Sequence, residues 1–330
     1  MRKLKVALGV VISLVCLGLA VVGIEWARVG DALERADWRY LVPSGVALLG
    51  FLLARSARWC VLLGPGVGLV RAFSLTNVGY LISNILPLRL GDPARAIGMG
   101  VGSEVKVSTA LSTVVVERVL DMLTVVVLLA LTVPFVAEAG WTMKAGLVGG
   151  AAGVAAMAVL IVLAVRPGWG RRFLDWLLLH LPWLDRQRWL ERFDGLAQGV
   201  VALRRPKDVA SLIGWSVVTW ALTVGHYLGI LRAFVEEPTV VEASFLTCAT
   251  AFGVALPSSP GAVGVFRSVA RYALQLPFGF SAETAAVIAF AAHAFQYVVM
   301  GGLGAVGLLS QDLSLSQLRA GAVEVAKRSE

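Results

Sequence analysis

The feature that most constrains this chain is an apolar segment broken by proline, glycine and charge at residues 84–95. Its sequence there is NILPLRLGDPAR. Pro87 and Pro93 lack an amide donor and exclude a straight helix, and Gly91 permits a positive φ between them. The apolar run before the break, residues 72–86, is too short to cross a bilayer and return. Backbone groups without partners are tolerated at membrane depth only inside protein or beside a wet cavity, so we interpret this stretch as a break point in a membrane protein.

The composition supports a membrane protein. Of the 330 residues, 58% are hydrophobic and 15% are charged, whereas soluble domains carry roughly 25% charge. The net charge is +8, but the basic residues gather in loops and no aromatic-interleaved basic surface is present, which argues against a nucleic-acid partner. The three cysteines and three histidines have no ligand spacing, so we expect neither a metal site nor a cofactor.

The hydropathy pattern predicts an all-α polytopic integral membrane protein. We expect about six full transmembrane helices plus two re-entrant broken hairpins, which makes up to eight hydrophobic segments. The full spans are predicted at about 5–24, 40–63, 107–133, 144–165, 208–234 and 282–309. The first run is too long for a signal peptide, and the basic residues place both termini on the cytoplasmic face of the cell membrane. Residues 25–39, with no positive excess, suit an outer loop.

We expect a single transmembrane domain over 1–310, followed by a cytoplasmic tail over 311–330. Its two halves, about 40–135 and 208–309, are joined by a basic cytoplasmic loop over 166–207. Apolar and aromatic residues interleave with arginine in that loop, which predicts amphipathic pieces lying on an anionic leaflet.

A second break follows the first in the other half. Leu256-Pro257 matches Leu86-Pro87, and Gly261 matches Gly91 at the same offset. The crossing count brings the first hairpin in from the cytoplasmic face and the second from outside. Two proline- and glycine-interrupted segments at corresponding places in halves of opposite topology are typical of an inverted-repeat transporter, with a binding site near the midplane. The residues assigned to hinges or gates are Pro87, Gly91, Pro93, Pro257, Pro260 and Gly264.

Three charged residues fall well inside the predicted span at 107–133. Glu117 and Asp121 share a helix face, with Arg118 three residues before Asp121. Isolated charges at that depth cost roughly 2.5–3.5 kcal/mol each, so they should pair or face water. Two interpretations stay open: an ion pair that holds helices together, or a proton- or headgroup-coupled site.

Four arginines gather near the first break. Arg55 and Arg58 share a face of the preceding helix, and Arg89 and Arg95 lie in the break itself. They favour a phosphate-bearing ligand, although snorkelling or an intraprotein partner also explains Arg55 and Arg58. The uncharged residues Asn84, Ser258 and Ser259 either donate to a ligand or cap helix ends. We expect His293 and Gln296 to form a packing hydrogen bond rather than a proton relay.

These motifs together resemble the lysylphosphatidylglycerol synthase transmembrane-region family, a flippase-like membrane domain that also occurs as a stand-alone protein. The resemblance covers roughly 50–270 and rests on Arg55-x-x-Arg58-Trp59, Asn84-x-x-Pro87-x-Arg89-x-Gly91-Asp92-x-x-Arg95, Glu117-Arg118-x-x-Asp121 and Pro257-x-x-Pro260-Gly261-x-x-Gly264. It implies a domain that moves a lipid across the cytoplasmic membrane, as proposed for aminoacylated phosphatidylglycerol. Other stand-alone members are linked to polyprenyl-phosphate-sugar or hopanoid pathways, so the substrate does not transfer with the fold.

The chain departs from the family pattern in two ways. We expect no soluble aminoacyltransferase domain after the last helix, so synthase activity is not implied. Arg267 stands where the family usually has an acid, and we expect it to favour a more anionic headgroup.

The leading functional hypothesis is a lipid translocase, flippase or scramblase for an anionic phospholipid or polyprenyl-phosphate-type lipid. The substrate-binding residues assigned are Arg55, Arg58, Asn84, Arg89, Asp92, Arg95, Glu117, Arg118, Asp121, Ser258, Ser259, Gly261 and Arg267. No nucleotide motif is present, so transport is expected to be gradient-driven or passive. A non-transporting scaffold that partners a lipid-modifying enzyme is the alternative, and an intramembrane transferase with Glu117 or Asp121 as base is a third. A homo-oligomer stays open.

Overall fold

The computed structural model describes residues 26–86, 90–101, 103–136, 167–180, 185–187, 189–190, 205–255 and 260–311, and every element in them is helical. This confirms the all-helical class. Two of the expected spans, 5–24 and 144–165, lie outside the described residues.

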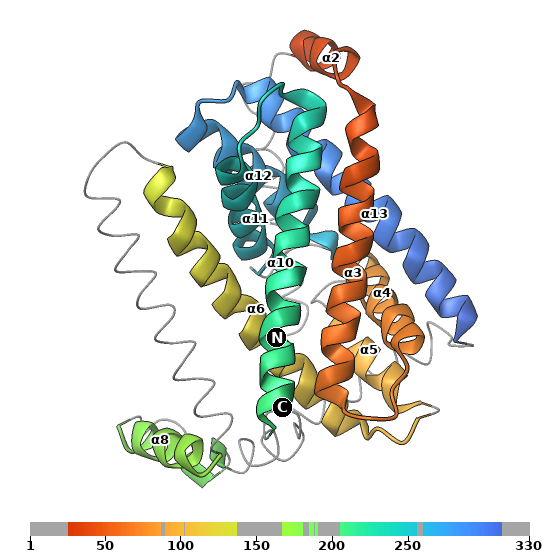
Figure 1. Ribbon diagram of the computed structural model, residues 1–330, viewed down its shortest axis with the longest axis vertical. Coiled ribbons are helices and arrows are strands. Elements are labelled where there is room, and N and C mark those ends of the chain that lie inside the picture. Colours follow the sequence, from red (N-terminus) through yellow and green to blue (C-terminus); the bar gives the residue numbers. More distant parts are fainter. Residues whose placement is uncertain are drawn as a thin grey trace.

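Three of the described helices are long and apolar enough to cross a membrane: α3 (Leu41–Leu63) with its preceding turn η1 (Trp38–Tyr40), α10 (Pro206–Phe234) and α13 (Ala282–Ser310). Figure 1 shows α3 and α10 side by side, and they pack closely along their lengths. Gly229 permits this approach, because a Cβ there would lie 2.8 Å from the Cβ of Ser44. The fourth long helix, α6 (Val107–Thr132), carries Glu117, Arg118 and Asp121 near its middle.

Four shorter helices form two packed pairs, which we call the first and second hairpins. The first hairpin is α4 (Leu69–Ile85) with α5 (Gly91–Gly100), and the second is α11 (Val240–Ala255) with α12 (Val263–Phe278). In Figure 1 the first pair lies in the lower half of the molecule and the second in the upper half. The 17 residues of α4 span about 26 Å at 1.5 Å per residue, less than the roughly 30 Å of bilayer hydrocarbon.

The first break falls where the sequence predicts it, but two of its residues act differently. Leu86 is extended, with φ −102° and ψ 142°, as expected for a residue before proline. The second helix then begins at Gly91, so Pro93 lies in the first turn of α5, where no amide donor is needed. Pro93 is therefore not the helix breaker we predicted.

The glycine at 91 is required by packing and not by a left-handed backbone. Its φ is not positive, contrary to the prediction. A Cβ at Gly91 would instead overlap the carbonyl oxygen of Gly79 and the hydroxyl of Ser83 on α4. The backbone of α5 thus lies directly against α4, and the two halves of the first hairpin are held at a distance only glycine allows.

The second break has a left-handed backbone, in contrast to Gly91 of the first. It passes through the turn η5 (Pro260–Ala262), where Gly261 has φ 66° and Ala262 has φ 52°. A non-glycine residue in this region is uncommon and strained. Gly264 lies buried in the first turn of α12. The turn η5 also packs against α4, so the tip of the second hairpin contacts the first.

The last helix, α13, forms a close contact with the first hairpin. A Cβ at Gly304 would lie 2.6 Å from the carbonyl oxygen of Asn77, and one at Gly307 would lie 2.8 Å from that of Ser74. We call this contact the α4–α13 seam. It brings the helix at the C-terminal end of the second half against the first half at backbone distance.

Two further helices lie at opposite ends of the long axis in Figure 1. At one end is α2 (Trp26–Glu34), within the segment expected to be a loop, so that segment is partly helical. At the other end is α8 (Pro167–Leu179), whose Trp169, Phe173 and Trp176 are exposed. This matches the amphipathic character predicted for the basic segment.

Candidate functional site

Three helices bring seven charged side chains into one group, which we call the arginine–carboxylate cluster. Arg55 and Arg58 come from α3, Asp92 and Arg95 from α5, and Glu117, Arg118 and Asp121 from α6. On each helix these residues recur three or four positions apart, except that Glu117 and Arg118 are adjacent, so they lie on one side of the helix. Four arginines and three carboxylates leave one positive charge in the cluster.

Glu117 lies at the centre of the cluster and is completely buried. Its Oε2 lies 3.1 Å from Nη2 of Arg95, and its Oε1 pairs with Nη2 of Arg55. The Nη2 of Arg58 lies 3.7 Å from the same Oε1. One carboxylate therefore joins arginines from two helices to α6.

Asp121 makes a second set of contacts one turn further along α6. Its Oδ1 accepts from Nη2 of Arg58 at 2.6 Å, and its Oδ2 lies 3.0 Å from Nη2 of Arg55. Arg58 also donates from Nη1 to the Ser216 hydroxyl on α10 at 3.0 Å. Arg58 is fully buried, so its charge is neutralised inside the protein and it is directed away from a ligand.

At the edge of the cluster, Arg118 and Asp92 form a bidentate pair. The Nε and Nη2 of Arg118 donate to the two carboxylate oxygens of Asp92 at 2.8 and 2.7 Å. The side chain of Arg118 is 45% exposed and that of Asp92 is 28% exposed, in contrast to Glu117. Of the four arginines, Arg118 is the one whose cation reaches open space.

Arg95 is buried but only partly paired. Its guanidinium lies over the Trp59 ring at 4.7 Å, and the indole of Trp59 donates to the Thr113 hydroxyl at 2.9 Å. Stacking on an aromatic face fixes the plane of the guanidinium. Its Nη1 has no hydrogen-bond partner among the described residues.

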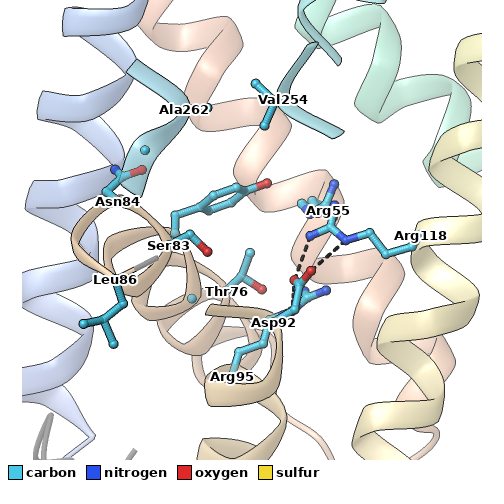
Figure 2. A pocket seen from close by; sticks show the side chains of 13 residues that line it. Arg55, Thr76, Ser83, Asn84, Leu86, Asp92, Arg95, Arg118, Val254 and Ala262 are labelled. Carbon is cyan, nitrogen blue, oxygen red and sulfur yellow. Dashed lines mark hydrogen bonds and ion pairs between the residues drawn. The ribbon is translucent and has the colours of Figure 1, made fainter. Parts of the chain in front are cut away.

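A cavity of about 150 Å³, the smaller cavity, opens where the cluster meets the two breaks. Figure 2 shows Asp92 and Arg118 on one side of it and Asn84 beside Ala262 on the other. The buried hydroxyl of Thr76 also has no partner. The lining consists of Arg55, Thr76, Gly79, Tyr80, Ser83, Asn84, Leu86, Asp92, Arg95, Arg118, Val254, Gly261 and Ala262. Three arginines and one aspartate line this cavity, and together with Arg58, Glu117 and Asp121 behind them they leave one surplus positive charge, which suits an anion.

A cavity of about 290 Å³, the larger cavity, shares part of this wall. The residues common to both are Arg55, Tyr80, Asn84, Arg118, Val254 and Gly261. From there the larger cavity extends between α10, α11 and α13, where its lining is mostly uncharged. The two cavities thus place charged and neutral polar groups side by side.

A buried polar network lies in the uncharged part of the larger cavity, which we call its neutral side. The Nδ1 of His226 lies 2.8 Å from the hydroxyl of Ser44, and its Nε2 lies 3.1 Å from Nε2 of Gln296. Gln296 also donates to the Tyr227 hydroxyl at 3.2 Å. The expected pairing of His293 with Gln296 is wrong, because Nε2 of His293 lies 3.1 Å from the carbonyl oxygen of Gly261. The network links helices that are far apart in sequence.

The structure brings most of the assigned site residues together. The cluster holds seven of them, and Asn84 and Gly261 line the smaller cavity. Arg267 lies elsewhere, with its guanidinium 4.1 Å from the Phe290 ring at a mainly apolar pocket that includes Trp38 and Phe295. Pro87, Arg89, Pro257, Ser258 and Ser259 lie outside the described residues, and Pro260 is described only in its backbone.

Several residues of the site are missing from the sequence assignment. Trp59 could have been assigned from the sequence, because it directly follows Arg58 in the helix that carries the first two arginines. The sequence gives no such indication for Thr76, Ser216 and His226. Polar residues are common in apolar helices, and only the packing shows which of them reach the cavities or the cluster. The described residues contain no group of three or more His, Cys, Asp or Glu side chains placed to hold a metal ion.

Comparison with known proteins gives a family match over nearly the whole chain. Residues 6–304 match the family model described as the lysylphosphatidylglycerol synthase TM region. A UPF0104 membrane protein of Methanothermobacter thermautotrophicus is 25% identical over 281 residues, which is 79% of this chain and 82% of that protein. No solved structure matches the chain.

Proposed function

Because the chain belongs to the lysylphosphatidylglycerol synthase transmembrane-region family, we propose that it moves an anionic lipid across the cell membrane, as a translocase or scramblase. The observation that carries the proposal is the smaller cavity, which is lined by three arginines of a cluster with one surplus positive charge. Two buried polar groups in that lining, Nη1 of Arg95 and the hydroxyl of Thr76, lack partners among the described residues. A phosphate oxygen accepts hydrogen bonds from both kinds of donor.

The binding step assigns different roles to the arginines. Arg95 and Arg118 contact the phosphate, while Arg55 contributes charge from the cavity wall. Glu117 and Asp121 hold Arg55 and Arg58 in place, which fixes the cation positions without a ligand. Asp92 occupies the fork of Arg118, and an incoming phosphate competes with it for the same two donors. Because Arg118 and Asp92 are both partly exposed, the phosphate can replace Asp92 as the partner of Arg118.

The transport step uses the two hairpins as gates. We propose that α4–α5 and α11–α12 are re-entrant hairpins of an inverted repeat, entering from opposite faces of the bilayer. The lengths of α4 and α5 and the contact between η5 and α4 support this proposal. A headgroup between the two tips then faces one side or the other, according to which tip moves.

The orientation follows from α8. Its exposed tryptophans and phenylalanine, together with Arg171 and Arg172, suit the surface of an anionic leaflet. We propose that this end of the molecule faces the cytoplasm, the side on which the basic residues of the sequence are expected to place both termini. The proposed partner is therefore a lipid of that membrane.

An enzymatic role has little support in the same geometry. A general base must be free to accept a proton, whereas Glu117 and Asp121 are both paired with arginines. We therefore propose that the chain binds and moves its lipid without changing its covalent structure.

The test is exchange of a fluorescent anionic phospholipid between the leaflets of vesicles containing the purified protein. Arg118→Gln removes the exposed cation and leaves the buried pairs in place, so we expect exchange to slow at least about tenfold, the loss of one charge-assisted contact. The matched control is Arg186→Gln. Arg186 forms the same bidentate contact with Asp175, at 2.6 and 2.8 Å, outside the cavities.

The outcomes separate clearly. Exchange that is fast in the wild type and the control but slow in Arg118→Gln supports the proposal. Exchange at the protein-free rate in the wild type, with several anionic headgroups, overturns it.

A further inference from the structure

The neutral side of the larger cavity contains buried polar atoms that the described protein leaves without partners. They are Nδ1 of His293, the hydroxyl of Tyr297 and Nε1 of Trp220, and all three residues line this cavity. His293 is only 4% exposed. Buried polar groups in folded proteins are almost always hydrogen-bonded, so three such atoms around one cavity indicate that something else bonds to them.

These groups belong to α10 and α13, whereas the arginine–carboxylate cluster belongs to α3, α5 and α6. Tyr297 and His293 also touch the tip of the second hairpin. A Cβ at Gly261 would overlap the Tyr297 hydroxyl, and the carbonyl oxygen of Gly261 lies 3.1 Å from Nε2 of His293. Since Gly261 also lines the smaller cavity, the unpaired groups lie directly next to the anion site.

The charge of the larger cavity limits what can bind there. Its acidic lining residue among the described ones is Asp121, which is paired with Arg55 and Arg58. The cations in its lining are Arg55 and Arg118, whereas Arg267, which is close enough to His293 and Tyr297 to act on them electrostatically, stacks on Phe290 and does not line the cavity. A cationic group therefore has no free carboxylate to meet, and a second anion meets no arginine in the lining beyond those of the cluster. Uncharged hydroxyl groups fit, because a hydroxyl both donates and accepts hydrogen bonds.

The unpaired atoms also match hydroxyls in their hydrogen-bonding character. The indole of Trp220 only donates, the Tyr297 hydroxyl donates and accepts, and the ring nitrogen of His293 does either according to its tautomer. The several hydroxyl groups of a polyol can form hydrogen bonds with such a set of uncharged donors and acceptors.

We infer that the larger cavity holds a second subsite, which binds the hydroxyl groups of an uncharged polyol headgroup while the smaller cavity binds its phosphate. The ligand class is a lipid phosphodiester with a glycerol, inositol or sugar headgroup. This inference rests on the proposed function, because it names the substrate class of the same site. It assigns Trp220, His293 and Tyr297 to headgroup recognition.

The test measures binding separately from transport. Short-chain phosphatidylglycerol, phosphatidic acid and phosphatidylethanolamine are titrated against the purified full chain in detergent, with the thermal stability of the protein as readout. We expect phosphatidylglycerol to bind about tenfold more tightly than phosphatidic acid, as one or two additional hydrogen bonds provide. Phosphatidylethanolamine, whose ammonium group meets no free carboxylate, binds more weakly than phosphatidylglycerol.

The variants remove single polar atoms and keep the rings. In the double variant Trp220→Phe with Tyr297→Phe, the preference for phosphatidylglycerol over phosphatidic acid falls to about one. Trp215→Phe is the matched control, because Trp215 lies on the same helix but is exposed and does not line the cavity. It retains the preference.

Three results decide the inference. Equal binding of phosphatidylglycerol and phosphatidic acid to the wild type overturns it, as does a preference that survives the double variant, which assigns the unpaired atoms to water. Preferential binding that is lost in the double variant supports it. If that binding occurs while vesicles show no exchange with any lipid, the proposed transport fails and the subsite stands.

Discussion

The two hairpins have similar sequence breaks but are stabilised by different chemistry. Around the first, α5 is tied to α3 and α6 by buried ion pairs centred on Glu117. Around the tip of the second, the contacts to α13 include a neutral hydrogen bond between His293 and the carbonyl oxygen of Gly261, and Arg267 of α12 stacks on the Phe290 ring. A buried ion pair tolerates little displacement, because a separated charge has no solvent to replace its partner. A neutral hydrogen bond is less costly to break, so we expect the tip of the second hairpin at Gly261 to move more readily than the first hairpin.

The backbone of each break supports the same distinction. The first ends α4 with an extended residue before proline and restarts at Gly91 in ordinary helical packing. The second uses left-handed conformations at Gly261 and Ala262, of which the alanine is strained. Strain at the second tip lowers the cost of changing its conformation. The following predictions test this comparison, beginning with the largest effect.

The largest effect is expected for Glu117→Leu. It deprives Arg55, Arg58 and Arg95 of one carboxylate partner each. Removing one member of a buried ion pair costs about 3–5 kcal/mol, so the variant should unfold at much lower temperature in detergent or fail to accumulate. Unfolding at the wild-type temperature contradicts the central role of Glu117.

A smaller loss of stability is expected when Gly261 or Gly91 is replaced by alanine, and a second substitution should rescue the two variants to different extents. Gly261→Ala costs about 1–3 kcal/mol through its left-handed backbone and the overlap with the Tyr297 hydroxyl. Adding Tyr297→Phe removes that oxygen and should restore part of the stability.

Gly91→Ala meets the Gly79 carbonyl of the α4 backbone, which no side-chain substitution removes. The additional change Ser83→Ala should therefore restore little of its thermal stability. Equal rescue at both positions argues against the distinction between the two hairpins.

A still smaller loss is expected for Gln296→Leu on the neutral side. It removes hydrogen bonds to His226 and to the Tyr227 hydroxyl, and the latter keeps its contact with Thr250 at 3.0 Å. The expected loss of folding stability is about 1–2 kcal/mol. It is measured by thermal unfolding of this variant and of Glu117→Leu under the same conditions. A loss as large as that of Glu117→Leu shows that the neutral network is as rigid as the cluster.

The smallest effect is expected for Arg186→Gln. Its contact with Asp175 is exposed, and exposed ion pairs add little to stability. The hydrogen bond from Arg186 holds the pKa of Asp175 below its usual value, so the variant should raise that pKa while the unfolding temperature at pH 7 stays the same. A clear loss of stability at pH 7 shows that α8 is held more tightly than its exposure indicates.

Much of the helical framework follows from the sequence, because long apolar runs and prolines act locally. The expected helix over 40–63 is observed at 41–63, and Pro87 ends α4 as predicted. The face shared by Glu117 and Asp121 follows from helical periodicity, and both contact Arg55.

The missed features depend on which helices touch. Gly91 needs its small size because of Gly79, and Gln296 finds His226 rather than His293. Nothing in the local sequence sets these partners, since they come from helices that are distant in the chain. The left-handed alanine at 262 is similarly set by packing, because alanine alone does not favour that conformation.

The α4–α13 seam has a consequence for the synthesis and membrane insertion of the protein. A chain emerges from the ribosome with its N-terminal part first, so α4 is synthesised long before the helix that carries Gly304 and Gly307. Until then the polar face of α4 around Ser74 and Asn77 lacks the neighbour that covers it in the finished molecule. The first half therefore needs temporary protection within the insertion machinery, and a chain truncated before α13 should be recognised as incomplete and degraded.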